Sequence, residues 1–207
     1  MFLPGRTETG LGLCCEEAAR LLVAQTEKAT LCGTVSEAPP RETVELLLFR
    51  QKLLDAAQNR RLSPGGRMQK ILTLSGASLP RRTARAWAAF FASLEALEPG
   101  WTEALSKLDK PVDYAGFRAV SAAWETEYEQ LLVYFLLRHL LADGGRGTAQ
   151  RAAFAVLSTA MLYALGAAAR TENGALTFGE RVELARLWSA NVEYSEENMR
   201  AVLGELT

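Results

Sequence analysis

The segment 131–141, LLVYFLLRHLL, is the feature that most restricts how this chain can fold. It is apolar on every side of a helix, so it belongs in a protein core and not on a surface. It also carries Arg138 and the only histidine, His139. Burial of a charged or titratable side chain is costly, and these two residues are therefore the best physical indication of a site.

Helix signals recur along the rest of the chain, and strand signals are almost absent. Between about 113 and 141, apolar residues follow three- and four-residue steps, which is the period of one buried helix face. The glycine-rich turn 143–147 separates this stretch from the uncharged, alanine-rich segment 152–169. We therefore predict an all-α, multi-helix bundle whose centre is an apolar helix pair at about 113–141 and 148–169.

Three of the predicted helices begin at local capping signals. Ser63 precedes a proline, Thr177 stands three residues before Glu180 in the pattern of a capping box, and Ser195 precedes two glutamates. We expect a helix to begin directly after each of these three residues.

Proline and glycine suggest how the chain is divided. The breaks at 76–80 and 110–111 favour an N-terminal helical segment (1–75), a variable connecting lobe (76–111) and a C-terminal helical core (112–207). A single domain is the alternative, because 207 residues suit either arrangement.

Charge and cysteine content limit the classes of binding partner and the cellular compartment that we expect for the protein. The chain has 23 Lys and Arg against 24 Asp and Glu, so no basic excess points to nucleic acid and no cationic cluster to a membrane surface. The segment 152–169 is short and alanine-rich for a membrane span, and we expect a buried core helix there. Three cysteines and a start without signal-peptide features favour a cytoplasmic protein.

Two clusters are candidates for chemistry. Glu127, Tyr134 and Arg138 project from one edge of the predicted helix beside His139, which suggests a buried acid–base or anion-binding group. The alternative is a satisfied core histidine and an arginine whose stem packs while its head reaches water or a carboxylate. Cys14-Cys15 either ligate a metal or are buried free thiols, and three cysteines are few for a metal site.

Three stretches together resemble the bacterial flagellin lysine N-methylases. The first is GLGLCCEEAARLLV at 10–23, which resembles the family's cysteine followed by an EAARL helix start. The second, at 125–141, resembles its tyrosine-rich YxxYLxYxxFRHF helix. The third and most specific, at 172–203, is similar to the family's ENGxxTFEDQVEIARLYSxEIEHSEEN pattern, with Tyr194 in place of the family's histidine.

This resemblance implies methylation of flagellin lysines, with S-adenosylmethionine as cofactor and flagellin or another lysine-bearing protein as partner. The family also carries a CxxCxxCC cluster, proposed to hold a metal or iron–sulfur centre, that lies upstream of the matched region. Cys15, with Cys14, falls where the family keeps a late cysteine, so both are metal-ligand candidates only in a longer form with that cluster.

We therefore expect the helical portion of such an enzyme, incomplete for catalysis alone. A non-enzymatic helical interaction module is the alternative. From helix geometry, Glu127 and Tyr134 are the candidate catalytic residues, because either can accept a proton from a lysine amine. Arg138 and His139 are the candidates for binding substrate or cofactor.

Overall fold

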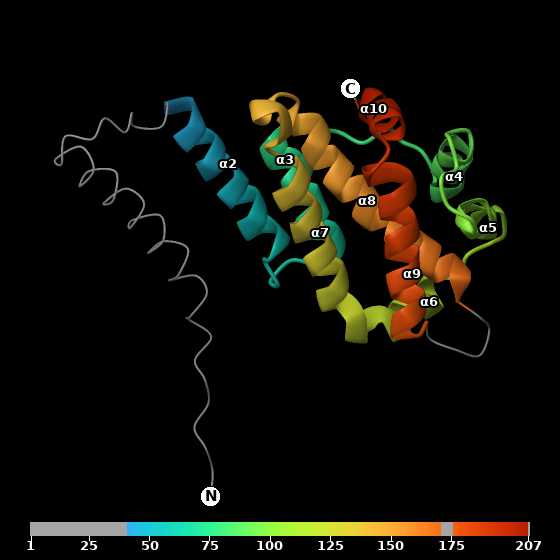
Figure 1. The fold of residues 1–207 in the computed structure, drawn as a ribbon. Coiled ribbons are helices and arrows are strands. Elements are labelled where there is room, and N and C mark those ends of the chain that lie inside the picture. Colours follow the sequence, from blue (N-terminus) through green and yellow to red (C-terminus); the bar gives the residue numbers. More distant parts are fainter. Residues whose placement is uncertain (1–40, 171–175, 207) are drawn as a thin grey trace, which may run out of the picture. The chain divides into compact units, whose positions relative to one another are not determined.

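The computed structural model describes residues 41–170 and 176–206. The chain divides into two units, residues 1–45 and 46–207, and most of the described helices lie in the second. The described residues form helices and no strand, so the predicted all-α fold is confirmed. Cys14 and Cys15 lie outside the described residues. The α-helices are α2 (Arg41–Ala57), α3 (Pro64–Ser75), α4 (Ala84–Ala92), α5 (Trp101–Ser106), α6 (Tyr114–Ser121), α7 (Glu125–His139), α8 (Thr148–Ala169), α9 (Phe178–Trp188) and α10 (Glu196–Gly204) (Figure 1).

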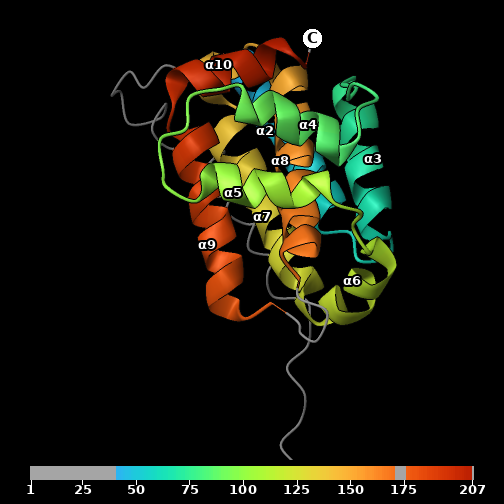
Figure 2. The same cartoon turned by 90° about the vertical axis from the view of Figure 1, so that its right-hand side faces the viewer.

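Helix α8 is the centre of the second unit. It packs along α7 and also contacts α3 and α9. Figure 1 shows α8 between α7 and α9, and Figure 2 shows α4 and α5 in front of it. The predicted central helix pair is therefore α7 and α8.

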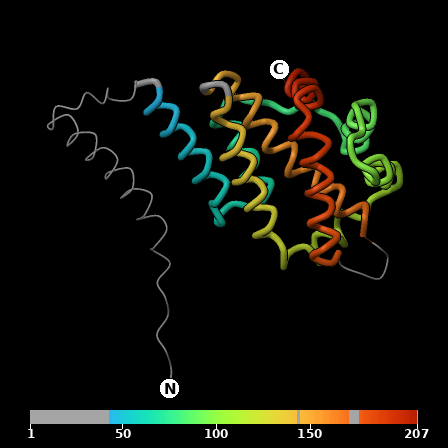
Figure 3. Tube along the Cα trace, viewed as in Figure 1, coloured from blue at the N-terminus to red at the C-terminus, as the bar shows by residue number. Residues whose placement is uncertain are grey.

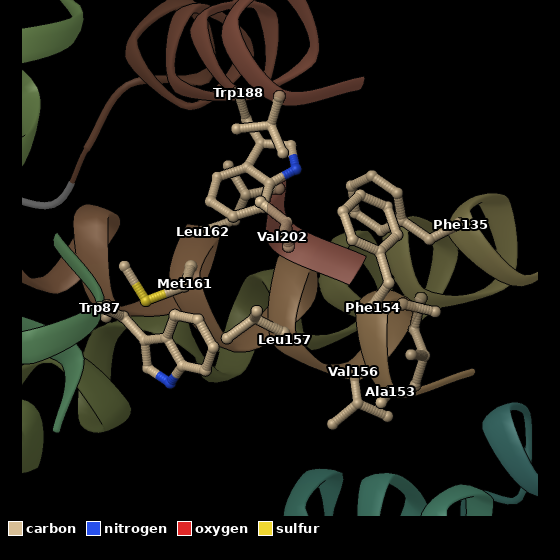
Figure 4. Close-up of a cluster of buried hydrophobic side chains, with 14 of the residues drawn as sticks. Trp87, Phe135, Ala153, Phe154, Val156, Leu157, Met161, Leu162, Trp188 and Val202 are labelled. Carbon is tan, nitrogen blue, oxygen red and sulfur yellow. The ribbon is translucent and has the colours of Figure 1, made fainter. Parts of the chain in front are cut away.

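The core around α8 is rich in aromatic side chains. Trp188 lies over Leu162 of α8, and Phe135 of α7 lies beside Phe154 (Figure 4). The rings of Phe135 and Phe154 meet edge to face with their centroids 6.1 Å apart. Such aromatic pairs add about 0.5–1.5 kcal/mol beyond the area that they bury, so the Phe135–Phe154 contact helps to hold α7 on α8.

The apolar composition of α8 is compatible with either a membrane span or a buried core helix, and its burial distinguishes the two. It is the one helix among the described residues that is long and apolar enough to cross a bilayer, with a mean hydropathy of 1.8. However, 78% of that apolar window is buried inside the protein. The prediction of a buried core helix is confirmed.

The predicted helix at 113–141 is interrupted. Helix α6 ends at Ser121, a 3-10 turn (η2) covers Ala122–Trp124, and α7 begins at Glu125. The cause is packing, because the Phe117 ring of α6 meets Tyr163 of α8 edge to face at 4.9 Å in a small separate cluster. A straight helix would carry Phe117 away from α8.

Local caps and one buried ion cluster hold the remaining helices. Ser63, Thr177 and Ser195 each accept a backbone N–H of the first turn of α3, α9 and α10, as predicted, and Thr177 forms a complete capping box. Arg67 of α3 is 3% exposed, and its Nη1 lies 2.7 Å from Oε2 of the buried Glu129 of α7. This ion pair joins α3 to the N-terminal half of α7.

Candidate functional site

A π-helical segment at the end of α9 carries a buried carboxylate. Residues Ser189–Glu193 (η4) continue α9 with a wider turn, in which the Tyr194 N–H donates to the Ser189 carbonyl at 2.9 Å. Figure 3 traces the chain from α9 through this segment into α10. The Glu193 side chain is fully buried. Short π segments inside helices occur often at functional sites.

Glu193 joins three of the four predicted site residues that the structure describes. His139 Nε2 lies 2.7 Å from Glu193 Oε1, and the Tyr134 hydroxyl donates to the same oxygen at 3.2 Å. Arg138 Nε is 3.5 Å away from it, and the Ser189 hydroxyl donates to Oε2. Because an ionised carboxylate only accepts hydrogen bonds, Nε2 of His139 carries the hydrogen.

The hydrogen bonds keep this buried carboxyl ionised. Burial alone raises the pKa of Glu193, but the hydrogen bonds from His139, Ser189 and Tyr134 outweigh it and lower the pKa below its usual value. Burial and the nearby Glu193 charge raise the pKa of the Tyr134 phenol to about 12. At neutral pH Tyr134 is therefore a hydrogen-bond donor, and its role as a proton acceptor stays a prediction.

His139 is buried, as the sequence predicts. Its ring stacks on Phe135 with centroids 6.4 Å apart and meets Phe154 edge to face at 5.1 Å. The residue is only 8% exposed, and its one polar contact in the described residues is Glu193. His139 therefore positions the carboxylate from the core side.

Arg138 covers the same carboxylate from the solvent side. Its guanidinium carbon lies 5.0 Å from the centroid of the Tyr194 ring and 6.0 Å from that of Tyr134. The side chain is 41% exposed. The two tyrosine rings orient the guanidinium group, and its Nε lies on the side of Glu193.

An apolar groove of about 440 Å³ begins at Tyr134 and runs between α7 and α9. Its floor is Leu162 of α8. Its walls include Glu127, Leu131 and Tyr134 of α7, and Phe178, Arg181 and Val182 of α9. Phe178 and Val182 are 69% and 47% exposed, which leaves large apolar side chains in contact with water.

Glu127 lines this groove but does not join the Glu193 cluster. Its carboxylate accepts two hydrogen bonds from Arg181, at 2.7 and 2.8 Å. The Arg181 guanidinium also lies 4.2 Å from the Trp124 ring centroid. Glu127 and Tyr134 both line the groove from α7, as their predicted shared helix edge requires. However, Tyr134 and Arg138 contact the carboxylate of Glu193 and not that of Glu127.

Sequence reasoning missed Glu193, although a signal was available. Glu193 belongs to the C-terminal block with the most specific family resemblance, beside the Tyr194 position that departs from it. Its partner His139 is 54 residues away, so no local spacing connects the two.

Comparison with known proteins identifies the family. The family model for the FliB lysine N-methylase C-terminal domain matches residues 16–207, which is most of the chain. Neither the curated proteins nor the solved structures gave a match. The three resembling stretches and the family model agree, and the chain therefore belongs to the FliB lysine N-methylase family, of which it carries the C-terminal domain.

Proposed function

We propose that this chain is the C-terminal part of a bacterial, cytoplasmic protein-lysine N-methyltransferase that uses S-adenosylmethionine to methylate flagellin. In this proposal its described residues form the surface that receives the substrate protein. The observation that carries the proposal is the family match over 16–207, together with an open groove that ends at an ordered polar cluster.

The groove between α7 and α9 does not fit S-adenosylmethionine itself. The cofactor carries an ammonium group and a ribose diol that need free acceptors, and the carboxylate in the groove, Glu127, is already bound by Arg181. Glu193 is fully buried beneath Tyr134 and His139. The described residues also contain no cluster of three His, Cys, Asp or Glu side chains placed to hold a metal. In this proposal the cofactor therefore binds outside this groove.

Substrate positioning is then the contribution of the described residues. A lysine amine is nucleophilic only after it loses its proton. Glu127, half-exposed at the groove edge, stays a predicted acceptor, but Arg181 already binds both of its oxygens. Tyr134 contributes a neutral hydroxyl and a ring. Holding the reactants together contributes several kcal/mol to such reactions, so a positioning surface has catalytic value without direct chemistry.

Mass spectrometry of flagellin tests the proposal directly. Flagellin is purified from the organism that encodes the chain, from a strain with the gene deleted, and from that strain with the gene restored. We expect methyl-lysine to disappear on deletion and to return on restoration. Unchanged lysine methylation in the deletion strain would contradict the proposal.

A non-enzymatic interaction module is the second candidate, favoured by the exposed apolar side chains of the groove and by the poor fit of that groove to the cofactor. Two measurements on the purified chain separate the candidates. Calorimetric titration with S-adenosylmethionine reports whether the chain binds the cofactor, and flagellin binding is measured in parallel. Flagellin that binds the chain but carries the same methylation in all three strains favours the module.

A further inference from the structure

The groove between α7 and α9 ends near Arg138, a charged side chain that is partly exposed to solvent. Along α7 the groove extends from Thr126 to Tyr134, and Arg138 lies one helical turn beyond. Residues 126–138 span about 18 Å of helix, because each residue adds about 1.5 Å. An occupant of this length is a helical segment of about three turns.

The walls of the groove suit an apolar helix face. Leu131 of α7 and Val182 of α9 line the groove together with Leu162 of α8. Phe178, the first residue of α9, lines it as well. Two helical walls with an apolar floor form the type of groove that takes residues spaced three and four apart on an amphipathic helix.

The positive charge of Arg138 indicates that a helix docked in the groove carries a negative charge at this end. Tyr194 and Tyr134 flank its guanidinium, and its Nε lies 3.5 Å from Oε1 of Glu193. The described residues offer its two Nη atoms no hydrogen bond. An arginine held in this way presents a planar pair of donors, which matches a carboxylate.

We propose that the groove docks an amphipathic helical segment of the substrate protein, with apolar side chains between α7 and α9 and an Asp or Glu carboxylate on Arg138. This inference rests on the proposed function, because it takes the occupant to be part of the protein that is methylated. It adds a docking site that recognises the substrate protein at a place distinct from the one where the reacting lysine binds.

Binding of purified flagellin monomer to the purified full chain tests the inference. Calorimetry is carried out with wild type, Arg138→Gln, Arg138→Lys and Val182→Asp. Arg118→Gln removes an exposed arginine of α6, and Leu48→Asp places a charge on an exposed apolar residue of α2 outside the groove, so these two are the matched controls.

We expect Arg138→Gln to weaken flagellin binding about tenfold or more, through loss of a charged hydrogen bond. Val182→Asp weakens it at least as much, because it places a charge in the apolar groove. Arg138→Lys gives an intermediate loss, and both controls bind as wild type does. Added salt weakens wild-type binding more than binding by Arg138→Gln. Arg138 and Val182 are both well exposed, and circular dichroism checks that their variants are folded.

Three outcomes would overturn the inference. In the first, the groove variants bind flagellin as wild type does while methylation in cells still depends on the gene, so the docking site fails and the proposed function stands. In the second, wild type does not bind flagellin and methylation does not depend on the gene, so both fail. In the third, Arg138→Gln loses binding of S-adenosylmethionine and keeps that of flagellin, which assigns Arg138 to the cofactor carboxylate.

Discussion

Replacement of Glu193 by glutamine tests whether a buried, ionised carboxylate organises the candidate site. Glutamine keeps the shape and one acceptor oxygen for His139 and Tyr134. It replaces charge-assisted hydrogen bonds with neutral ones that are about half as strong, and its amide nitrogen faces the Ser189 hydroxyl. Relief of the buried charge offsets part of the loss, so we expect Glu193→Gln to lower the free energy of unfolding by about 1–2 kcal/mol at pH 7.

The effect of this substitution depends on pH in a defined direction. The folded protein lowers the pKa of Glu193, whereas the unfolded chain keeps it near about 4.3. The carboxylate therefore stabilises the fold at pH values above the pKa that Glu193 has in the unfolded chain. This contribution disappears as the pH falls through the lower pKa of the folded protein. The difference between wild type and Glu193→Gln therefore shrinks as the pH falls below about 4.

Urea unfolding followed by tryptophan fluorescence measures both effects, because Trp101 and Trp188 are buried and report loss of the core. Glu95→Gln is the matched control: Glu95 is exposed and its side chain makes no ion pair within the described residues, so a change within about 0.5 kcal/mol is expected. Equal stability of Glu193→Gln and wild type at pH 7 would refute the reasoning. So would a difference that stays the same at about pH 3.5.

Three further predictions concern the supports of the site. Glu129→Gln leaves the buried Arg67 guanidinium with a single partially exposed carboxylate partner, and urea unfolding is expected to show a loss of about 3 kcal/mol; a loss under about 1 kcal/mol would contradict this. Thr177→Ala removes the capping box of α9 and is expected to cost about 1 kcal/mol in the same assay, whereas an unchanged midpoint would show that the cap is unimportant. Tyr134 is expected to ionise at a pKa of about 12, seen as an ultraviolet absorbance step that Tyr134→Phe removes, and Glu193→Gln should lower that pKa because it removes a neighbouring negative charge.

The helix starts were predictable because their signals are local. Ser63, Thr177 and Ser195 cap helices through atoms only a few residues away, so the residues that form each cap stand together in the sequence. The all-α fold follows from the repeated three- and four-residue spacing of apolar residues, which depends on no distant partner.

The break between α6 and α7 was not predictable from the same spacing. The residues of the 3-10 turn, Ala122–Trp124, have no helix-breaking proline or glycine, and the apolar stripe continues across them. The turn arises because Phe117 packs on Tyr163 of α8 while α7 lies along a different part of α8. Tertiary packing therefore overrides a local pattern that is compatible with one long helix.

The inward position of Glu193 depends on one wide helical turn. Glu193 keeps the contact of an ordinary helical turn, because the hydroxyl of Ser189, four residues earlier and only partly buried, donates to its Oε2. In a π turn each residue lies near the one five positions before it, so Glu193 falls on the side of Trp188, which is 0% exposed. A search with the ordinary helical period therefore places this carboxylate near the surface.

The wide turn is itself held by a distant loop. Asn191, inside the π segment, accepts hydrogen bonds from the backbone N–H groups of Leu97 at 2.7 Å and Glu98 at 3.2 Å. Asn198 of α10 donates to the Asn191 carbonyl at 2.7 Å, and its amide also reaches the Glu95 carbonyl. The carboxylate that gathers Tyr134, Arg138 and His139 is thus placed by contacts almost a hundred residues away in sequence, which is why the sequence indicated three members of the cluster but not the residue that joins them.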